Sequence, residues 1–278
     1  MKKAIVFLLC LCLFTGIMAV GAGATMEDNA VAILIDGDIF APPAPMILLD
    51  GTTYVPLRAF SLTMDENAVI NWNNITKTAS VRSQNLEIQV TVGQQYLIAN
   101  GRYLYIPDKC FMYENNTMVP VRQLAKAFGA SVGWNNATKT VTISAKGAPI
   151  ESGGTIYDQD ELYWLSRIIF SESGAEVLEG QIGVGNVVLN RVTSSLYPCT
   201  IHDVVFDTLY GVQFTPIASG TIHKTPSEKS VIAAKLVLDG AVTTGDSLFF
   251  LNEAIATSTW IVYNRDFVVT IGDHSFYA

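Results

Sequence analysis

A glutamate stands where an apolar segment runs into a glycine, in the stretch SRIIFSESGAEVLEG that begins at Ser166. The residues before it include four with the spacing of one helix face, namely Leu162, Leu165, Ile168 and Ile169. Gly174 indicates the end of that helix, which leaves Glu172 in its last turn. The negative end of the helix macrodipole and the apolar neighbours both disfavour a charged carboxylate there. Glu172 should therefore hold a proton nearer neutral pH, the state in which a general acid can protonate a glycosidic oxygen.

Two interpretations of Glu172 stay open on spacing alone. A solvated glutamate at a helix end explains the pattern as well as a catalytic acid does. Glu176 and Glu179 are expected in the first turn of the next helix, where acidic residues are stabilising. A glycosidase with two carboxylates holds them about 5 to 9.5 Å apart across the sugar, and Glu176 lies beyond a glycine turn. The sequence supports one catalytic carboxylate.

Other reactive residues do not form a recognisable site. One G-x-S-x-G match occurs, at Gly129–Gly133, but ASVGW is expected to be a strand of the second repeat's hairpin, so the match lacks the strand-to-helix turn of a serine hydrolase. Cys199 precedes His202 by three residues, which indicates a loop entering a helix more than a catalytic dyad. The three histidines lack the spacing of metal ligands, so we expect no metal and no cofactor. His274 is expected to be a hydrogen-bonded structural residue.

Length and composition favour two globular domains. The chain has 278 residues, of which 50% are hydrophobic and 15% charged, so most of it should be ordered. The net charge of −8 argues against a nucleic-acid partner. We expect Cys110 and Cys199 to be small buried residues, and their pairing stays open.

The N-terminus has the pattern of a secretory signal peptide. Two lysines precede an apolar run, and the small residues Ala22-Gly23-Ala24 follow as a cleavage site. An uncleaved anchor is the alternative, because the apolar run approaches the length of a membrane span. We expect a signal peptide over residues 1–24 and an exported protein with no membrane attachment after cleavage.

The N-terminal half contains an internal repeat. DGTTYVPLRAF at Asp50 matches ENNTMVPVRQL at Glu114, with an offset of 64 residues. INWNNITKTASV matches VGWNNATKTVTI, where Trp72 and Trp134 correspond with an offset of 62. Each unit is expected to form a strand, a short helix and a hairpin. The tryptophan should cap the core of its own unit, with sugar stacking as the less common alternative.

On these motifs, about residues 30–145 resemble the stalk-type domain named for the N-terminal region of copper amine oxidases. Copper is not expected, because no histidine precedes His202. The resemblance implies a spacer or cell-wall attachment module, which we place at residues 25–146. A short flexible linker should follow over residues 147–157, where glycine, proline and serine are frequent.

The remaining residues, 158–278, are expected to form a mainly helical domain that ends in a small sheet. Helices are predicted from an N-cap at Asp160, through LEGQIGVGNVVLNRV, at IHDVVF, and after an N-cap at Thr225. SLFFL, WIVYN, FVVTIG and HSFYA alternate like strands. The fold class is therefore α+β.

SRIIFSESGAEVLEGQIGVGNVVLNRV resembles the opening of the SleB/CwlJ-type cell wall hydrolases. YPCTIHDVVF, VQFTPIASGTI, SLFFLNEAIATSTWIV and VVTIGDHSFYA match later family motifs in order. The resemblance covers about residues 160–278 and implies a lysozyme-like, lytic-transglycosylase-type fold with one glutamate as acid and then base. Glu172 falls on that position. The family arginine after it is absent, because Ser173-Gly174-Ala175 stands there.

The resemblance implies cleavage between N-acetylmuramic acid and N-acetylglucosamine in peptidoglycan strands, by a lytic transglycosylase or a muramidase. Spore cortex lysis is one process that such cleavage would serve. Gln213, Phe214 and Asn252 fall on family motifs and are the candidates for lining the cleft. The protein would be secreted and act in the cell wall or spore envelope. The alternative is a non-catalytic wall-binding or spore-coat protein that retains the fold, in which Glu172 would be buried or point to bulk solvent.

Overall fold

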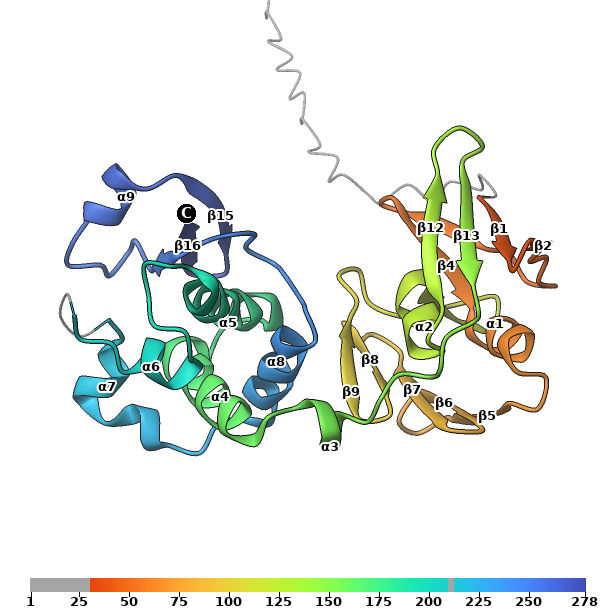
Figure 1. The fold of residues 1–278 in the computed structure, drawn as a ribbon, viewed down its shortest axis with the longest axis horizontal. Helices are drawn as coiled ribbons and strands as arrows, with labels where there is room; N and C mark the ends of the chain where they lie inside the picture. The colour runs from red at the N-terminus through yellow and green to blue at the C-terminus, as the bar shows by residue number, and fades with distance from the viewer. Residues whose placement is uncertain (1–30, 210–212) are drawn as a thin grey trace, which may run out of the picture.

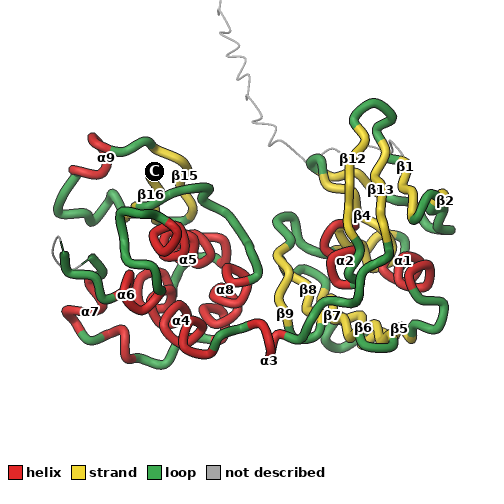
Figure 2. The backbone as a smooth tube through the Cα atoms, viewed as in Figure 1, coloured by secondary structure: helices red, strands yellow, loops and turns green. Residues whose placement is uncertain are grey.

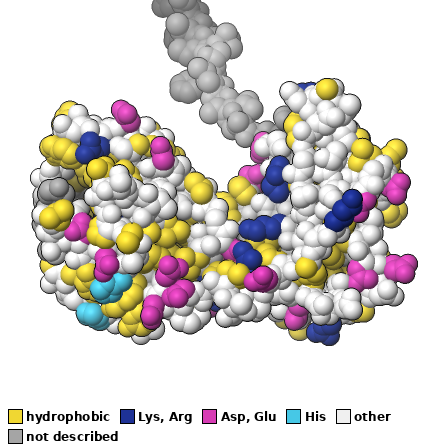
Figure 3. All heavy atoms as spheres, in the orientation of Figure 1, with side chains coloured by type: hydrophobic (Ala, Val, Ile, Leu, Met, Phe, Trp, Pro, Cys, Tyr) yellow, Lys and Arg dark blue, Asp and Glu magenta, His cyan; other side chains and the backbone are white. Residues whose placement is uncertain are grey.

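The computed structural model describes residues 31–209 and 213–278, and the predicted signal peptide, residues 1–24, lies outside them. The chain forms two domains joined by the short helix α3 (Gly153–Ile156), with the strands gathered in the first and most helices in the second (Figures 1 and 2). The molecule is hollowed between the domains on the face drawn in Figure 3, where acidic and basic side chains are interspersed. The α+β class predicted from the sequence is confirmed.

The N-terminal domain contains three sheets and two helices. Its strands are β1 (Ala32–Ile35), β2 (Asp38–Ile39), β3 (Ile47–Leu49), β4 (Thr52–Pro56), β5 (Val69–Asn73), β6 (Thr78–Ser83), β7 (Leu86–Thr91), β8 (Tyr96–Ala99), β9 (Arg102–Tyr105), β10 (Phe111–Tyr113), β11 (Asn116–Pro120), β12 (Ser131–Asn135) and β13 (Thr140–Ser144). The helices α1 (Leu57–Met64) and α2 (Val121–Ala127) begin directly after Pro56 and Pro120. The helix and the loop after it are each one residue shorter in the second repeat, which accounts for the change in offset from 64 to 62.

A local two-fold arrangement relates the two repeats. The central sheet has the order β10-β11-β4-β3, and Val55 of β4 lies opposite Val119 of β11, its equivalent in the other repeat. The two other sheets are interleaved, because the N-terminal strand β1 pairs in parallel with the last strand, β13. The equivalent hairpin β8–β9 joins the sheet β5-β6-β7-β8-β9 of the first repeat. Neither repeat can therefore complete its sheets without the other.

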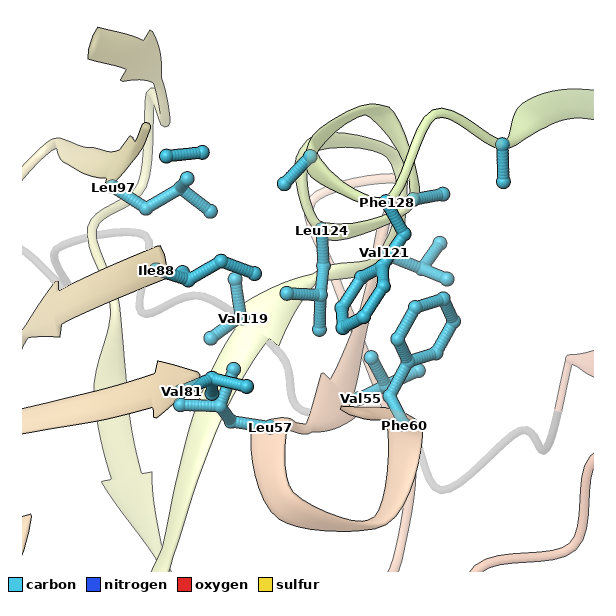
Figure 4. Packing of buried hydrophobic residues seen from close by; sticks show 14 of the residues in the cluster. Val55, Leu57, Phe60, Val81, Ile88, Leu97, Val119, Val121, Leu124 and Phe128 are labelled. Carbon is cyan, nitrogen blue, oxygen red and sulfur yellow. The ribbon is translucent and has the colours of Figure 1, made fainter. Parts of the chain in front are cut away.

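The core of this domain lies between the central sheet, the helices and the strands below them (Figure 4). Phe60 of α1 packs edge-on against Phe128 at the end of α2, with ring centroids 6.1 Å apart. Trp72 and Trp134 are not part of this core, since they are 42% and 49% exposed. The expectation that each tryptophan caps its own repeat is therefore wrong.

The C-terminal domain is mostly helical, with a small sheet at its end, as predicted. Three helices build its core: α4 (Gln159–Ser173), α5 (Leu178–Thr193) and α8 (Glu228–Leu238). The shorter elements are α6 (Ile201–Val205), α7 (Thr215–Ser219), the 3-10 helix η1 (Thr221–His223) and α9 (Trp260–Asn264). The sheet has the order β14-β16-β15, formed by Phe249–Leu251, His274–Tyr277 and Phe267–Ile271.

Three local predictions were wrong in this domain. The N-cap of α4 is Asp158, whose carboxylate accepts from the N–H groups of Asp160 and Glu161. The N-cap of α8 is Ser227 in place of Thr225, because the Ser227 hydroxyl reaches the N–H of Ser230. WIVYN forms the helix α9 instead of a strand. There the Ser258 hydroxyl accepts from the first N–H of the helix.

The segment 147–157 is ordered, so the prediction of a flexible linker is wrong. The N–H of Ile150 donates to the carbonyl of Ala127, and the amide of Asn100 donates to the carbonyl of Ile150. The N–H of Gly153 in turn donates to the carbonyl of Asn100. Because these bonds attach the segment to the N-terminal domain along its length, it cannot act as a free hinge.

One buried carboxylate joins the two domains. Asp239, at the C-cap of α8, has a side chain that is 1% exposed and accepts hydrogen bonds from Arg102 of β9 and from the hydroxyl of Tyr157. Lys126 of α2 donates to the Asp239 carbonyl at 3.2 Å. Three tyrosines of the N-terminal domain also pack on the helical core, namely Tyr96, Tyr103 and Tyr105. Removing one partner of such a buried pair is strongly destabilising, so the contact holds the domains in one arrangement.

The helix α5 packs closely because it carries glycines on its buried faces. A methyl group on Gly183 would come 2.7 Å from Phe276 Cζ and 2.8 Å from Thr244 Cγ2. A methyl group on Gly185 would come 2.9 Å from Ile169 Cδ1 of α4. The absence of side chains at these two positions lets α5 contact both α4 and the C-terminal sheet.

We predict that Gly183→Ala lowers the free energy of unfolding by about 1 to 2 kcal/mol, because the cost of overpacking exceeds the gain in helix propensity. Urea unfolding followed by circular dichroism measures this change. Gly154→Ala in α3 is the matched control, since the nearest atom would lie at 3.6 Å, an ordinary contact. An unchanged or higher stability of Gly183→Ala would contradict the account of α5.

Candidate active site

Glu172 lies in the last turn of α4, and Gly174 follows as the C-cap. The side chain is half-buried, and within residues 31–209 and 213–278 its carboxylate makes no hydrogen bond or ion pair. This placement is neither that of a fully buried residue nor that of a carboxylate in bulk solvent. A group of this kind can give a proton to a bound molecule without first breaking an internal bond.

Burial raises the pKa of Glu172 from its ordinary value of 4.5 to about 7, and the charge of Arg191 opposes that rise. Desolvation was expected from the apolar neighbours in the sequence, and its direction is confirmed. Near neutral pH the carboxyl group therefore exists in both protonation states. This is the condition under which one residue can act as an acid and then as a base.

Arg191 of α5 is the cation of this site, and sequence reasoning missed it. The side chain is 5% exposed, and its Nε donates to the carbonyl of Leu248 at 2.8 Å. Its guanidinium lies 5.0 Å from the ring centroid of Tyr197 and 5.1 Å from that of Phe214. Burial lowers the pKa of Arg191, while Tyr197, Asp207 and Glu172 oppose that shift. A charged residue inside the apolar run GVGNVVLNRV was the available signal.

A second polar residue that the sequence analysis overlooked fixes the turn after Glu172. Gln181 is fully buried, and its amide nitrogen donates to the carbonyls of Gly174 and Glu176 at 3.2 and 3.1 Å. Its amide oxygen accepts from the Ser230 hydroxyl of α8 at 2.8 Å. A side chain at position 174 is excluded, because its Cβ would lie 2.6 Å from the Phe170 carbonyl oxygen. The end of α4 is therefore held by bonds from both neighbouring helices.

Glu176 is not in the first turn of α5, contrary to the prediction, because the helix begins at Leu178. Its carboxylate accepts from the N–H of Asp273 at 3.2 Å and lies 3.6 Å from Nδ1 of His274. His274 is buried, but the expectation that it is hydrogen-bonded is wrong for Nδ1, which has no hydrogen-bond partner among the described residues. Burial lowers the pKa of His274, and Glu176 opposes the shift.

Glu179 does lie in the first turn of α5, as predicted, and accepts from the Gln95 amide of the other domain.

The three candidates for lining the cleft differ in placement. Phe214 is 2% exposed and belongs to the helical core, so its assignment as a substrate contact is wrong. Its ring lies 6.5 Å from that of Phe250 in β14, which brings the segments around positions 214 and 250 together. Gln213, next to Phe214, and Asn252, just after β14, are half-buried. The Asn252 side chain accepts from the N–H of Ala254 at 3.0 Å, which is a turn contact.

Among the described residues, Cys110 and Cys199 are unpaired. Cys199 is exposed where a buried residue was expected, whereas Cys110 is buried. In the part of the chain that the structure describes, no group of three or more His, Cys, Asp or Glu side chains could hold a metal ion. No helix of the same part has the length and apolar character needed to cross a membrane.

Comparisons with known proteins identify both halves. Residues 34–143 match the copper amine oxidase N-terminal domain, and residues 175–277 match the cell wall hydrolase family. The second match begins three residues after Glu172 and includes Gln181 and Arg191. The C-terminal domain is thus that of an enzyme family acting on the cell wall. The chain therefore carries a copper amine oxidase N-terminal domain in front of a cell wall hydrolase domain.

Similar proteins cover the C-terminal half. A spore cortex-lytic enzyme of Bacillus cereus is 35% identical over 131 residues, which is 47% of this chain and 48% of that protein. The spore cortex-lytic enzyme of Bacillus subtilis is 31% identical over 120 residues, 43% of this chain and 38% of that one. The solved catalytic domain of the germination-specific lytic transglycosylase SleB from Bacillus anthracis is 33% identical, with a TM-score of 0.41, covering 46% of this chain and 100% of that one. The chain spans about half the length, or less, of the spore cortex-lytic enzymes it matches.

The raised pKa of Glu172 predicts a pH-dependent stability. Between about pH 4.5 and pH 7 the folded chain binds more protons at this position than the unfolded chain, so stability falls as pH rises through that window. Glu172→Gln removes this loss of stability, because the amide does not ionise. We expect the variant to gain on the order of 1 to 3 kcal/mol relative to wild type between pH 4 and pH 8.

Urea unfolding at the two pH values measures the difference. Glu161→Gln, at an exposed position in the first turn of the same helix, is the matched control and should follow wild type. If Glu172→Gln and wild type changed in parallel with pH, the carboxyl of Glu172 would not be desolvated in the folded protein.

Proposed function

We propose that the protein is a secreted lytic transglycosylase that cleaves peptidoglycan between N-acetylmuramic acid and N-acetylglucosamine, with Glu172 as its single acid and base. The observation that supports this most directly is the half-buried carboxyl group of pKa about 7 in a domain of the cell wall hydrolase family. The signal peptide expected over residues 1–24 would deliver the chain to this polymer. The names of the relatives favour spore cortex as the substrate.

In the first step of the proposed reaction, protonated Glu172 gives its proton to the glycosidic oxygen, and the bond from that oxygen to C1 of the muramoyl sugar breaks. The oxygen of the muramoyl C6 hydroxyl forms a new bond to C1. The hydroxyl proton passes to the Glu172 carboxylate, which regenerates the acid. The product carries a 1,6-anhydro ring, and no water is consumed.

The surroundings of Glu172 support a mechanism with one carboxylate. Glu176, the next acid along the chain, accepts from the N–H of Asp273 and lies beside His274, so it is committed to a structural contact. Arg191 contributes a buried positive charge that stabilises the carboxylate formed after proton transfer. Burial favours the protonated form of Glu172, and Arg191 favours the carboxylate. The two forms therefore have similar free energies near neutral pH.

The test is digestion of purified cortex and vegetative peptidoglycan by residues 25–278, with mass analysis of the released muropeptides. Wild type and the control Glu161→Gln should release fragments with anhydro ends. Glu172→Gln should lose at least about a hundredfold in rate, the lower range for a removed general acid. Reducing ends from wild type would make the enzyme a hydrolase. Release by Glu172→Gln at the wild-type rate would remove Glu172 from the mechanism.

A pH profile tests the role given to Arg191. Because the proton donor must be protonated, wild-type activity should fall as pH rises through about 7. Arg191→Met removes the charge that lowers the pKa of Glu172, so the same decline should move to higher pH. Arg191→Lys keeps the charge and should leave the decline near its wild-type position. An unmoved profile in Arg191→Met would show that Arg191 does not act on Glu172.

A further inference from the structure

The N-terminal domain has two pockets, each with the tryptophan of one repeat on its wall. The first pocket has a volume of about 710 Å³ and is lined by Trp72, Arg58 and Lys77 among others. The second has a volume of about 580 Å³ and is lined by Trp134 and Arg122. The sequence analysis found these tryptophans and arginines as repeat markers, and the function proposed for the hydrolase domain does not use them.

The two pockets are equivalent in construction. The arginines correspond with the offset of 64 residues and the tryptophans with the offset of 62, and the apolar floor follows the same rule. Leu57, Ile70 and Ala79 of the first pocket correspond to Val121, Val132 and Val141 of the second. The same wall has therefore been built twice in one chain, with an apolar floor that belongs to the domain's core and an exposed tryptophan beside it.

The hairpins that carry the tryptophans are fixed in the same way. Trp72 lies opposite Ala79 in the hairpin β5–β6, and Trp134 lies opposite Val141 in β12–β13. The side chain of Asn73 accepts from two N–H groups of the first turn, and Asn135 does the same in the second. Each indole is thus held on a rigid strand while 42% and 49% of the residue stay exposed. The two hairpins project in different directions from the domain (Figure 1).

The side chains that line the pockets are suited to binding a sugar polymer that carries negative charges. The flat face of an indole stacks on the C–H face of a pyranose ring, and tryptophan offers the largest such surface. A guanidinium beside it binds carboxylates in a planar, two-point geometry. The charged side chains lining the two pockets are Arg58, Lys77 and Arg122, with no acid among them, although the chain as a whole has a net charge of −8. The pockets are therefore positively charged, although the protein as a whole is negatively charged.

We propose that the two tryptophan pockets bind glycan strands of peptidoglycan, with the indoles stacked on sugar rings and the arginines paired with stem-peptide carboxylates. This inference rests on the proposed function, because peptidoglycan is the polymer that the same chain would cut. Two equivalent sites on one module suit a ligand whose disaccharide unit repeats along a strand. Binding at both sites raises the local concentration of the hydrolase domain on its substrate.

The rigid contact between the domains gives this binding a consequence for the enzyme. Asp239 accepts bonds from Arg102 and Tyr157, and Gln95 donates to Glu179 in the first turn of α5. Since Glu179 belongs to the helix that also carries Arg191, a strand held by the pockets lies at a fixed position relative to the candidate active site.

The test is cosedimentation of the full chain with purified peptidoglycan that has been freed of phosphate-containing polymers. All variants also carry Glu172→Gln, so that the polymer is not degraded during the measurement. Trp72→Ala and Trp134→Ala should each weaken binding by about tenfold, and the double variant by about a hundredfold or more. Ile75→Ala is the matched control, because Ile75 is an exposed apolar residue on the same hairpin as Trp72 but does not line the pocket.

Wild-type affinity of the double tryptophan variant, with its circular dichroism spectrum unchanged, would overturn the proposal. So would an equal loss in Ile75→Ala, because it would show a general effect of the hairpin surface. Binding that appears only when phosphate-containing polymers are left on the wall would assign the pockets to those polymers and also overturn it. The digestion experiment with the unmodified chain is separate, so a lack of cleavage would count against the catalytic proposal and leave the binding result intact.

Discussion

Desolvation of one carboxyl group at the end of α4 is the constraint on which the account of this protein depends. A charged glutamate there loses hydration, which raises its pKa to about 7, and the nearby charge of Arg191 limits that rise. Arg191 supplies that charge from a position that is itself buried, which lowers its own pKa. Gln181, the glycines of α5 and the Gly174 turn all serve to bring α4 and α5 close enough for this balance.

The N-terminal domain is also held in one arrangement, by pairing between strands of its two repeats. Its two repeats share a central sheet around the pair Val55 and Val119, and the first strand closes the last sheet. The ordered segment before α4 and the buried Asp239 then attach this unit to the hydrolase domain. Buried contacts therefore hold the two domains in one arrangement, with the candidate active site in one domain and the proposed binding pockets in the other.

Much of this could be predicted from the sequence, because it depends on local patterns. The repeat, its offsets, the helix that carries Glu172 and the desolvation of that residue all follow from spacing and apolar periodicity. The parallel pairing of β1 with β13 could not, since no local pattern specifies a partner about 110 residues away.

The exposed tryptophans were misjudged because a large aromatic residue beside a hairpin is usually buried. Phe214 was misassigned because its position in a family motif does not reveal what its ring packs against. WIVYN was misassigned because alternation of apolar and polar residues does not reveal the packing of a segment either. Arg191 was overlooked because its role appears only when α4 and α5 are brought together.

The most direct test is titration of the Glu172 carboxyl group itself, by ¹³C NMR of the chain with labelled glutamate side chains, using Glu172→Gln to assign the resonance. The account predicts a midpoint near pH 7 for this one resonance in the free protein. A midpoint near the ordinary glutamate value of 4.5 would mean that the group is solvated and charged at neutral pH. In that case Glu172 would be an ordinary helix-end glutamate, and the proposal of a single acid and base would be contradicted.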